Sequence, residues 1–265
     1  MKLIFIKLGG SLITDKHNPS VPNRTSIMQL ATEIADALRL NPELKLIIGH
    51  GSGSFGHVPA KKYDTYNGAY SPAQWQGFIE VWKEARTLNQ IIIDALFAFD
   101  LPILAFPPSA ALISENRMVT SWDLTPLEKA LQANLIPLIN GDVVFDTAIG
   151  CTILSTEELF FHLATIFQPE RILLAGLDYG VYNDYPECNH LLELITPETY
   201  SEIKNRLKKS AAVDVTGGML QKVQTMIDLI IRFPKIQASI FSGTHPGNLM
   251  RALQGATPGT TLRHH

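Results

Sequence analysis

The feature that most constrains the fold is a series of short runs of consecutive apolar residues, each followed by a longer segment that includes helical periodicity. The runs occupy residues 3–6, 46–48, 102–105, 136–139, 172–175 and 238–241. An uninterrupted apolar run of this length is typical of a strand buried on both faces, and strands that alternate with helices indicate a mostly parallel sheet. The sequence therefore predicts an α/β layered fold.

Several helices begin with residues that favour a helix N-terminus. Ser71 and Pro72 open a helical pattern that runs to about residue 99, and residues 155–158 (STEE) form a capping box. Thr25 or Ser26 is expected to cap a helix over residues 27–38. Further helices are expected from residues 125, 196 and 218, and a β-hairpin is expected from residues 142–145 and 152–154, which flank Gly150.

Composition limits the classes of partner and the location. The formal net charge of -3 and the pI of about 6.2 give no reason to expect nucleic acid or an anionic membrane. The N-terminal apolar run is too short for a signal peptide, because Lys7 interrupts it, and no run approaches the roughly 20 apolar residues of a membrane span. Cys151 and Cys188 lack metal spacing, so two free thiols in a cytoplasmic protein are expected.

The glycine-rich segment at residues 51–58 (GSGSFGHV) matches two nucleotide-binding patterns. A dinucleotide site needs a regular helix after the glycines and an acidic residue on a later strand, but Val58 and Pro59 weaken the first turn and residues 64–70 have no strand pattern. A protein kinase needs H-R-D and D-F-G, and neither is present. The segment is instead expected to place backbone N–H groups at the carboxyl edge of the sheet.

Lysines lie beside two further glycine-bearing turns. Lys7 stands in an apolar run, where burial is costly unless the side chain points into a polar site; the alternative is a lysine that reaches solvent at the sheet edge. Lys222 lies one turn into the helix that follows Gly217 and Gly218, a spacing that suits phosphate oxygens but also a capped helix with a surface lysine. Lys16 alone is typical of a solvated loop.

Taken together, these motifs resemble the amino acid kinase family in order and spacing. The matching segments are residues 7–11 (KLGGS), 51–58, 140–142 (NGD) and 214–219 (DVTGGM). Within the family, residues 53–57 (GSFGH) followed by 59–63 (PAKKY) are similar to the isopentenyl phosphate kinases. The resemblance implies one domain over residues 1–265, a three-layer αβα sandwich with an open central sheet, an acceptor-binding lobe at 1–166, a nucleotide-binding lobe at 167–262, and a homodimer.

The resemblance also implies an activity and roles for individual residues. The family members phosphorylate isopentenyl phosphate with ATP and Mg²⁺, giving isopentenyl diphosphate. Lys7 would bridge the transferring phosphoryl group, Lys222 would contact the ATP phosphates, and Lys16 would assist on the donor side. His57 would hydrogen-bond the acceptor phosphate. No dedicated protein metal site is expected, because Mg²⁺ would be held by the ATP phosphates and water.

Two sets of binding residues follow from the resemblance. Those on the nucleotide side are Gly9, Gly10, Ser11, Asp178, Gly180, Gly217, Gly218 and Lys222. Those on the acceptor side are Gly51, Ser52, Gly53, Ser54, Gly56, His57, Lys62, Phe78, Val81, Ala85, Gly141 and Asp142. The backbone N–H groups of Gly9, Gly10, Gly53 and Ser54 would line the phosphate path. Phe78, Val81 and Ala85 would line a pocket for the five-carbon tail, although core packing alone also explains them. The role of residues 155–158 stays open.

The chemistry of a phosphate acceptor agrees with this division of roles. A phosphomonoester has a second pKa of about 6, so it is largely dianionic at neutral pH and needs no general base. Phosphoryl transfer requires alignment and charge stabilisation more than covalent participation. The alternatives are another small-molecule kinase of the family, such as a fosfomycin kinase, or a non-catalytic ligand-binding or storage protein, which would have no need for Lys7, His57 and Lys222 together.

Overall fold

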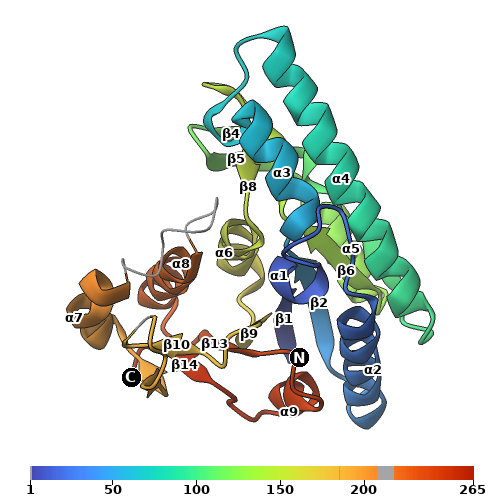
Figure 1. Ribbon diagram of the computed structural model, residues 1–265. Coiled ribbons are helices and arrows are strands. Elements are labelled where there is room, and N and C mark those ends of the chain that lie inside the picture. The colour runs from blue at the N-terminus through green and yellow to red at the C-terminus, as the bar shows by residue number, and fades with distance from the viewer. Residues whose placement is uncertain (1, 185, 208–217) are drawn as a thin grey trace.

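An eight-stranded sheet forms the centre of the molecule (Figure 1). The computed structural model describes residues 2–184, 186–207 and 218–265. The sheet order is β12-β14-β13-β9-β1-β2-β6-β3, and among the described strands the pair β13–β14 is antiparallel while the other neighbouring pairs are parallel. The bounds are β1 Leu3–Leu8, β2 Lys45–His50, β3 Ile103–Ala105, β6 Ile136–Asn140, β9 Arg171–Gly176, β12 Leu194–Ile195, β13 Gln237–Ser242 and β14 Thr260–Leu262. The predicted apolar runs thus form six strands of this sheet, of which β3 lies at the edge and the others in the interior.

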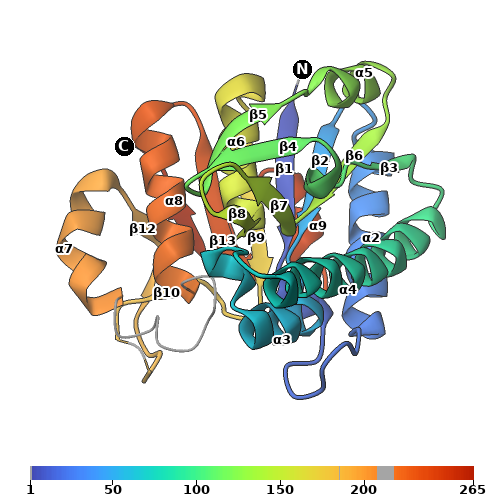
Figure 2. The same cartoon turned by 90° about the horizontal axis from the view of Figure 1, so that it is seen from above.

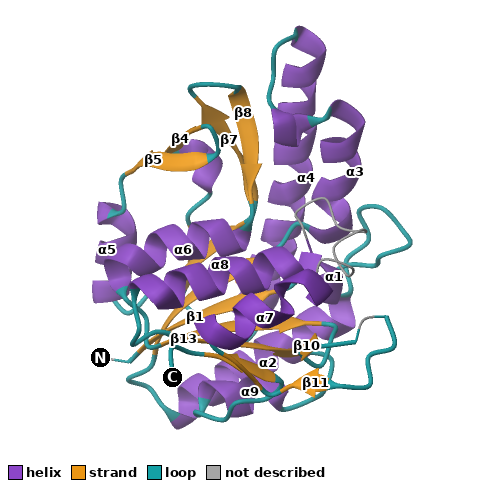
Figure 3. Ribbon diagram, turned by 90° about the vertical axis from the view of Figure 1, so that its left-hand side faces the viewer, coloured by secondary structure: helices purple, strands orange, loops and turns teal. Residues whose placement is uncertain are grey.

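Helices cover both faces of this sheet, because successive side chains of a strand point to opposite faces. Leu3 and Phe5 of β1 belong to one apolar cluster with α5 (Thr125–Gln132), α6 (Thr156–Phe167), α7 (Pro197–Leu207) and α8 (Gly218–Arg232). Ile4 and Ile6 belong to a second cluster with α1 (Gly10–Ile13), α2 (Arg24–Leu40), α9 (Asn248–Leu253) and the second half of α4 (Pro72–Phe97). Figure 3 shows the sheet between these layers. The predicted αβα sandwich is confirmed.

A second sheet stands apart from the first, beside α3 (Gly53–Tyr63) and α4 (Figures 1 and 3). Its order is β5-β4-β7-β8, with β4 Leu112–Glu115, β5 Met118–Trp122, β7 Asp142–Asp146 and β8 Gly150–Leu154. The predicted hairpin is β7–β8, and Gly150 adopts the positive φ of +81° that its turn requires. The β4–β5 hairpin was not predicted, because the side chains of β5 are exposed or half-buried and show no apolar alternation.

The helices expected from residues 125, 196 and 218 are α5, α7 and α8, and two of the three predicted helix caps agree with the structure. Ser71 caps α4 by accepting the N–H of Gln74, and Ser155 with Glu158 forms the capping box of α6. The expected cap at Thr25 or Ser26 is wrong: α2 begins earlier, and Asn23 accepts the N–H of Ser26 at 3.2 Å. Asn satisfies a free N-terminal N–H group better than Thr does, which favours the earlier start.

Helix α3 begins within the glycine-rich segment and continues through Pro59, where a regular helix was not expected. Proline removes one intrahelical hydrogen bond, but Phe55, Pro59 and Ala60 are buried and α3 packs along α4. Figure 2 shows the two helices side by side. Packing therefore outweighs the local cost of the proline, and His57 lies on a helix, not on a loop.

Smaller elements complete the described chain. They are the 3₁₀ helices η1 (Thr65–Asn67) and η2 (Pro108–Ala110) and the antiparallel pair β10 (Val181–Tyr182) and β11 (Leu191–Leu192). Cys151 and Cys188 are both free, as predicted. Among the described helices, none combines the length and the apolar character that a bilayer span requires.

Candidate active site

Lys7 and Glu157 form the centre of the candidate site. Lys7 follows Leu3 and Phe5 in the alternation of β1, so its side chain lies on the sheet face that α6 and α8 cover. The Lys7 ammonium donates a hydrogen bond to the Glu157 carboxylate of α6, and both residues are buried. The expectation that Lys7 points into a polar site is confirmed, and a lysine that reaches solvent is excluded.

Lys222 adds a second positive charge near the same carboxylate. Burial alone would raise the pKa of Glu157, but the charges of Lys7 and Lys222 and the Lys7 hydrogen bond hold this pKa below its usual value. One carboxylate oxygen, Oε2, accepts from Lys7, whereas Oε1 has no hydrogen-bond partner among the described residues. The structure therefore brings two of the predicted lysines, from β1 and α8, to one anionic side chain.

The sequence leaves the role of residues 155–158 open, and the structure shows that Glu157 is the partner of Lys7. The capping box at residues 155–158 predicts the start of α6, but it does not predict which residue is the partner of Lys7. A signal was present: Glu157 lies next to Glu158 in the first helical turn, and only Glu158 is needed for the capping box.

The third predicted lysine, Lys16, lies on the surface and not in the buried pair. It is exposed, on the loop that joins Thr14 to Pro22. The Asp15 carboxylate shapes this loop by accepting the N–H groups of His17 at 2.7 Å and Asn18 at 3.3 Å. Lys16 is thus presented to solvent by an ordered turn.

The two N-terminal glycine turns are packed against each other. A Cβ atom on Gly10 would lie 2.7 Å from the Cα of Gly53, and one on Gly51 would lie 2.9 Å from the N of Gly10. Gly53 also has a φ of +50°, which disfavours other residues. These glycines are needed first for the close approach of two backbones, at a point where a Gly51 Cβ would lie 3.8 Å from the Lys7 side chain.

Two of the four N–H groups expected along the phosphate path already have partners. Gly9 donates to the carbonyl of Ala175 at 2.8 Å, and Ser54 donates to the hydroxyl of Thr14 at 3.0 Å. The expectation is wrong for these two amides, because the turns use them to hold their own geometry. Gly10 and Gly53 are the first residues of α1 and α3, where N–H groups have no intrahelical acceptor.

Ser52, Gly56 and His57 belong to the residues predicted for the acceptor side, and they lie at the start of α3. Ser52 has a φ of −76°, so a serine fits between the glycines without strain, and its hydroxyl donates to the carbonyl of Gly141 at 2.9 Å. Gly56 lies against Ser52, where a Cβ would approach the Ser52 Cβ to 2.6 Å. His57 is half-buried, one turn into α3. The helix therefore presents His57 next to the turn that contacts Gly141.

Asp142 is buried and supports the turn that carries Gly141. Its carboxylate accepts the N–H groups of Ser109 at 3.1 Å and of Val143 at 2.9 Å. Burial raises the pKa of Asp142 to about 6, although the hydrogen bonds from Ser109 and Val143 oppose this. Both carboxylate oxygens thus have backbone partners, and these hydrogen bonds stabilise the turn that carries Gly141.

His50, at the end of β2, is a residue that sequence reasoning missed. Its side chain is fully buried, with Nδ1 3.2 Å from the carbonyl of Gly51 and Nε2 3.0 Å from the amide nitrogen of Asn89. Burial, with a smaller effect of the Lys7 charge, lowers the pKa of His50 to about 4, although the contact with the Gly51 carbonyl opposes this shift. A neutral ring with its proton on Nδ1 satisfies both contacts. The signal was its position directly before the glycines.

The predicted tail-pocket residues share the inner face of α4. Phe78, Val81 and Ala85 are buried. Phe78 and Val81 belong to a third apolar cluster, whose other buried members are Ala60, Ala69, Val143 and Cys151. This cluster lies between α3, α4 and the smaller sheet, and the rings of Phe78 and Phe145 are 4.9 Å apart. The apolar side chains thus gather on the acceptor side, remote from α8.

Lys62 lies on the outer end of α3. Its ammonium is exposed and donates to the hydroxyl of Tyr63 at 2.6 Å, with the Glu80 carboxylate at 3.6 Å. Lys62 therefore contacts the adjacent Tyr63 and Glu80 of α4.

The remaining nucleotide-side residues are spread over three elements. Ser11 is half-buried in α1, Asp178 is exposed after β9, and Gly218 starts α8 with a φ of +58°. Gly180 is packed against Thr260, where a Cβ would lie 2.5 Å from the hydroxyl oxygen. Gly217 lies outside the described residues, as does most of residues 214–219.

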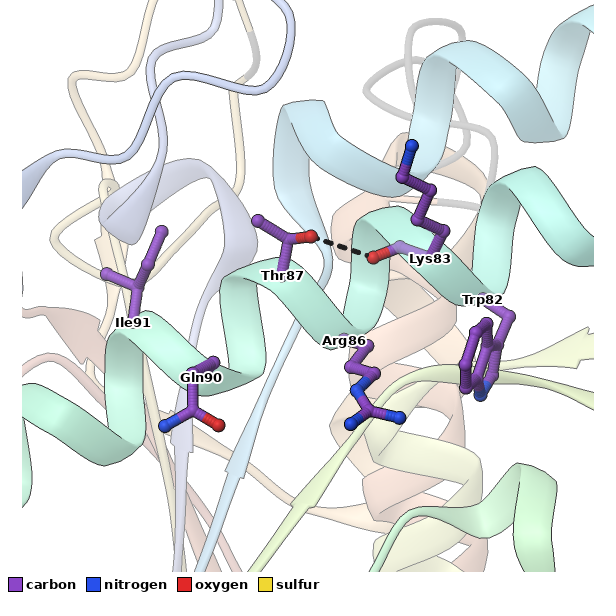
Figure 4. A pocket seen from close by; sticks show the side chains of 6 residues that line it. All are labelled: Trp82, Lys83, Arg86, Thr87, Gln90 and Ile91. Atoms are coloured by element: carbon purple, nitrogen blue, oxygen red, sulfur yellow. Dashed lines mark hydrogen bonds between the residues drawn. The ribbon is translucent and has the colours of Figure 1, made fainter.

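A separate hollow lies along the outer face of α4 (Figure 4). Its volume is about 580 Å³, and its lining residues are Trp82, Lys83, Arg86, Thr87, Gln90 and Ile91. None of these is a predicted site residue, and the glycine turns do not contribute to it. Within the described parts of the chain, no three His, Cys, Asp or Glu side chains are grouped closely enough to hold a metal ion.

Comparison with known proteins extends the likeness over the whole chain. The sequence matches the model of the amino acid kinase family over residues 2–242. It is 33% identical to the isopentenyl phosphate kinase of Methanocaldococcus jannaschii, with 98% of each chain covered. It is 30% identical to that of Methanothermobacter thermautotrophicus, with 96% of each covered. A solved isopentenyl phosphate kinase structure has a TM-score of 0.83 at 27% identity, covering 98% of this chain and 99% of that one.

Proposed function

This chain belongs to the amino acid kinase family, and on that premise we propose that it transfers the γ-phosphoryl group of ATP to isopentenyl phosphate, forming isopentenyl diphosphate and ADP. One observation carries the proposal. Lys7 and Lys222 both place a positive charge near the buried Glu157 carboxylate, and the Lys7 side chain lies beside the glycine turns. The relatives over nearly the full length are isopentenyl phosphate kinases, which supports this acceptor.

The two lysines supply the positive charge that phosphoryl transfer needs. Negative charge spreads over the oxygens of the transferring group and its neighbours in the transition state, and fixed cations stabilise it. Glu157 keeps the Lys7 ammonium in one position, so little reorganisation is needed when the phosphates arrive. Lys222, near the start of α8, serves the ATP phosphates, and the exposed Lys16 assists on the donor side.

The acceptor phosphate is held by α3 and its glycine turn. His57 donates a hydrogen bond to the acceptor phosphate, and the N–H group of Gly53, the first residue of α3, adds to this contact. The acceptor is already dianionic and attacks in line, so no residue has to remove a proton. The five-carbon tail lies against Phe78 and Val81 in the third apolar cluster, which excludes water from the acceptor side.

Mg²⁺ enters with ATP, whose phosphate oxygens it neutralises when bound. Magnesium keeps several waters and is usually held by substrate phosphates and one or two carboxylates. Glu157 would suit such a role, because its buried Oε1 has no hydrogen-bond partner among the described residues and would be open to a water of the magnesium ion. The protein acts as a cytoplasmic homodimer and supplies isopentenyl diphosphate to isoprenoid biosynthesis.

A panel assay tests the acceptor. ADP release is measured with ATP and Mg²⁺ in the presence of isopentenyl phosphate, fosfomycin, glutamate or UMP. Turnover is expected with isopentenyl phosphate and at least about a hundredfold less kcat/KM with the others, because they lack the apolar tail or the monoester phosphate. Turnover of fosfomycin or UMP without turnover of isopentenyl phosphate refutes the assignment, and ligand binding without ADP release indicates a non-catalytic binder.

A further inference from the structure

Arg117 occupies an unfavourable backbone position at the tip of the β4–β5 hairpin. Asn116 and Arg117 form the two-residue turn, with φ values of +47° and +68°. A turn with two positive φ values usually contains Asn or Gly, and a long side chain is strained there. The Asp146 carboxylate holds the turn by accepting the N–H groups of Asn116 at 3.1 Å and Arg117 at 2.8 Å. The turn is thus fixed by its backbone, independently of the arginine side chain.

The Arg117 side chain connects three other elements. Its guanidinium lies 3.5 Å from the ring centroid of Tyr66 in η1, donates to the Thr152 hydroxyl of β8 at 2.7 Å, and donates to Glu158 of α6 at 3.1 Å. A planar guanidinium is suited to stacking and to several simultaneous hydrogen bonds. Arg117 therefore links the hairpin, the η1 turn before α4 and the start of α6.

The contact with Glu158 leads directly to the candidate site. Glu158 Oε1 accepts from Arg117, while its Oε2 accepts the N–H of Ser155 at 2.7 Å in the capping box. The next residue toward the N-terminus is Glu157, which holds Lys7. On the other side, Thr156 donates to the carbonyl of His50 at 2.7 Å. The first turn of α6 is thus fixed on both sides of Glu157.

We propose that Arg117 is a positioning residue for phosphoryl transfer, which acts through Glu158 on the first turn of α6 and so on the Glu157–Lys7 pair. This inference rests on the proposed function. Without Arg117 the turn of α6 loses one of its two lateral supports, and the Lys7 ammonium is held less exactly where the transferring group passes. Displacements of about 1 Å in such a position are known to cost up to about a hundredfold in rate.

Arg117→Gly separates positioning from stability. Glycine suits the positive φ, so relief of backbone strain is expected to offset part of the stability that is lost with the guanidinium contacts, and thermal unfolding measures the balance. The matched control is Asn116→Gly, which makes the same change at the neighbouring exposed position. Arg117→Gly is expected to lower kcat about tenfold with little change in the KM for ATP, and Asn116→Gly is expected to match the wild type.

A double-mutant cycle tests the route through Glu158. Glu158→Gln is expected to lower kcat about as much as Arg117→Gly, and the double variant to be no slower than either, since both changes break one connection. Arg117→Lys is expected to recover part of the loss. A wild-type kcat in Arg117→Gly, or effects that multiply in the double variant, overturns the inference.

Hydrogen exchange tests the inference without a substrate. The amides of Ser155, Glu158 and Leu159 report on the start of α6, because they bond within the capping box or to the Ser155 carbonyl. They are expected to exchange faster in Arg117→Gly than in Asn116→Gly. If the wild type does not phosphorylate isopentenyl phosphate, the proposed function fails while this measurement still decides the inference: equal exchange in the two variants overturns it.

Discussion

Lys7 and Glu157, 150 residues apart in the sequence, are paired through side chains that are only 10% and 5% exposed. A buried ion pair contributes little net stability compared with apolar residues of the same volume, because both charges lose their hydration. Its maintenance therefore points to function, and Lys222 near the same carboxylate strengthens this conclusion. We therefore expect the negative charge of the substrate phosphates to be stabilised at this pair.

Removal of the Glu157 charge is expected to affect stability and catalysis together. Glu157→Gln leaves the Lys7 ammonium buried without a counter-ion, so the free energy of unfolding is expected to fall by about 3 kcal/mol and kcat by at least about a hundredfold. Urea unfolding at pH 7 and ADP release measure the two effects. Glu170→Gln is the control, since its pair with Lys2 at 3.2 Å is exposed and is expected to be worth under about 1 kcal/mol. Wild-type values in Glu157→Gln would contradict this role.

His57→Gln tests the acceptor side alone. Glutamine is uncharged and lacks the imidazole geometry, so kcat for isopentenyl phosphate is expected to fall by about a hundredfold or more. The Kd for ATP is expected to change less than about twofold, because His57 serves the acceptor. Steady-state kinetics and calorimetry measure these quantities. The exposed His190, bonded to Asp184 at 2.9 Å, provides the control variant His190→Gln. A large loss of ATP affinity in His57→Gln would argue against this division of roles.

Gly10→Ala tests the packing of the two glycine turns. The new methyl group would lie 2.7 Å from the Cα of Gly53, so the turns must separate. The free energy of unfolding is expected to fall by about 2 kcal/mol, with a loss of turnover. Gly176→Ala is the stability control, because a Cβ there meets no atom within 4 Å. Chemical denaturation of the two variants compares them, and equal stabilities would show that the turns are not close-packed.

Asp142 and His50 are expected to give opposite pH dependences of stability. The pKa of Asp142 is raised to about 6, so the protonated form favours the folded state; this contribution is present below pH 3.8 and is lost as pH rises through 6. The pKa of His50 is lowered to about 4 from 6.5, so stability is lost as pH falls through this window. Each effect amounts to at most about 3 kcal/mol. The two contributions largely cancel in the wild type.

Asp142→Asn removes one of these opposing contributions. Relative to the wild type, this variant is expected to gain stability between pH 4 and pH 6, by up to about 3 kcal/mol. Urea unfolding at half-unit pH intervals measures the difference. Asp123→Asn, an exposed carboxyl whose pKa is lowered mainly by hydrogen bonds from Thr125, is expected not to show such a gain. A difference that does not depend on pH would refute burial as the cause.

Local sequence determined the elements that carry the fold. The apolar runs gave six strands of the main sheet, and Ser71 and Ser155 marked helix starts, because strand burial and capping depend on residues that are neighbours in the chain. The prediction that Lys7 points into a polar site is confirmed for the same reason, because it depends only on the apolar residues next to Lys7 in the chain. A charge in a buried run needs a polar environment, whichever residue provides it.

Tertiary structure decided which residues provide that environment. Glu157 is the partner of Lys7, Asn89 is the partner of His50, and Arg117 contacts Glu158. Each of these contacts joins segments that are distant in the sequence. Helix α3 continues through Pro59 for the same reason, since its packing against α4 outweighs a local penalty. The sequence by itself determined the six strands of the apolar runs, most of the helix starts and the polar surroundings of Lys7, because their causes are local. The partners and the burial of the site residues are decided only when the chain folds, because no local pattern specifies which distant side chains come into contact.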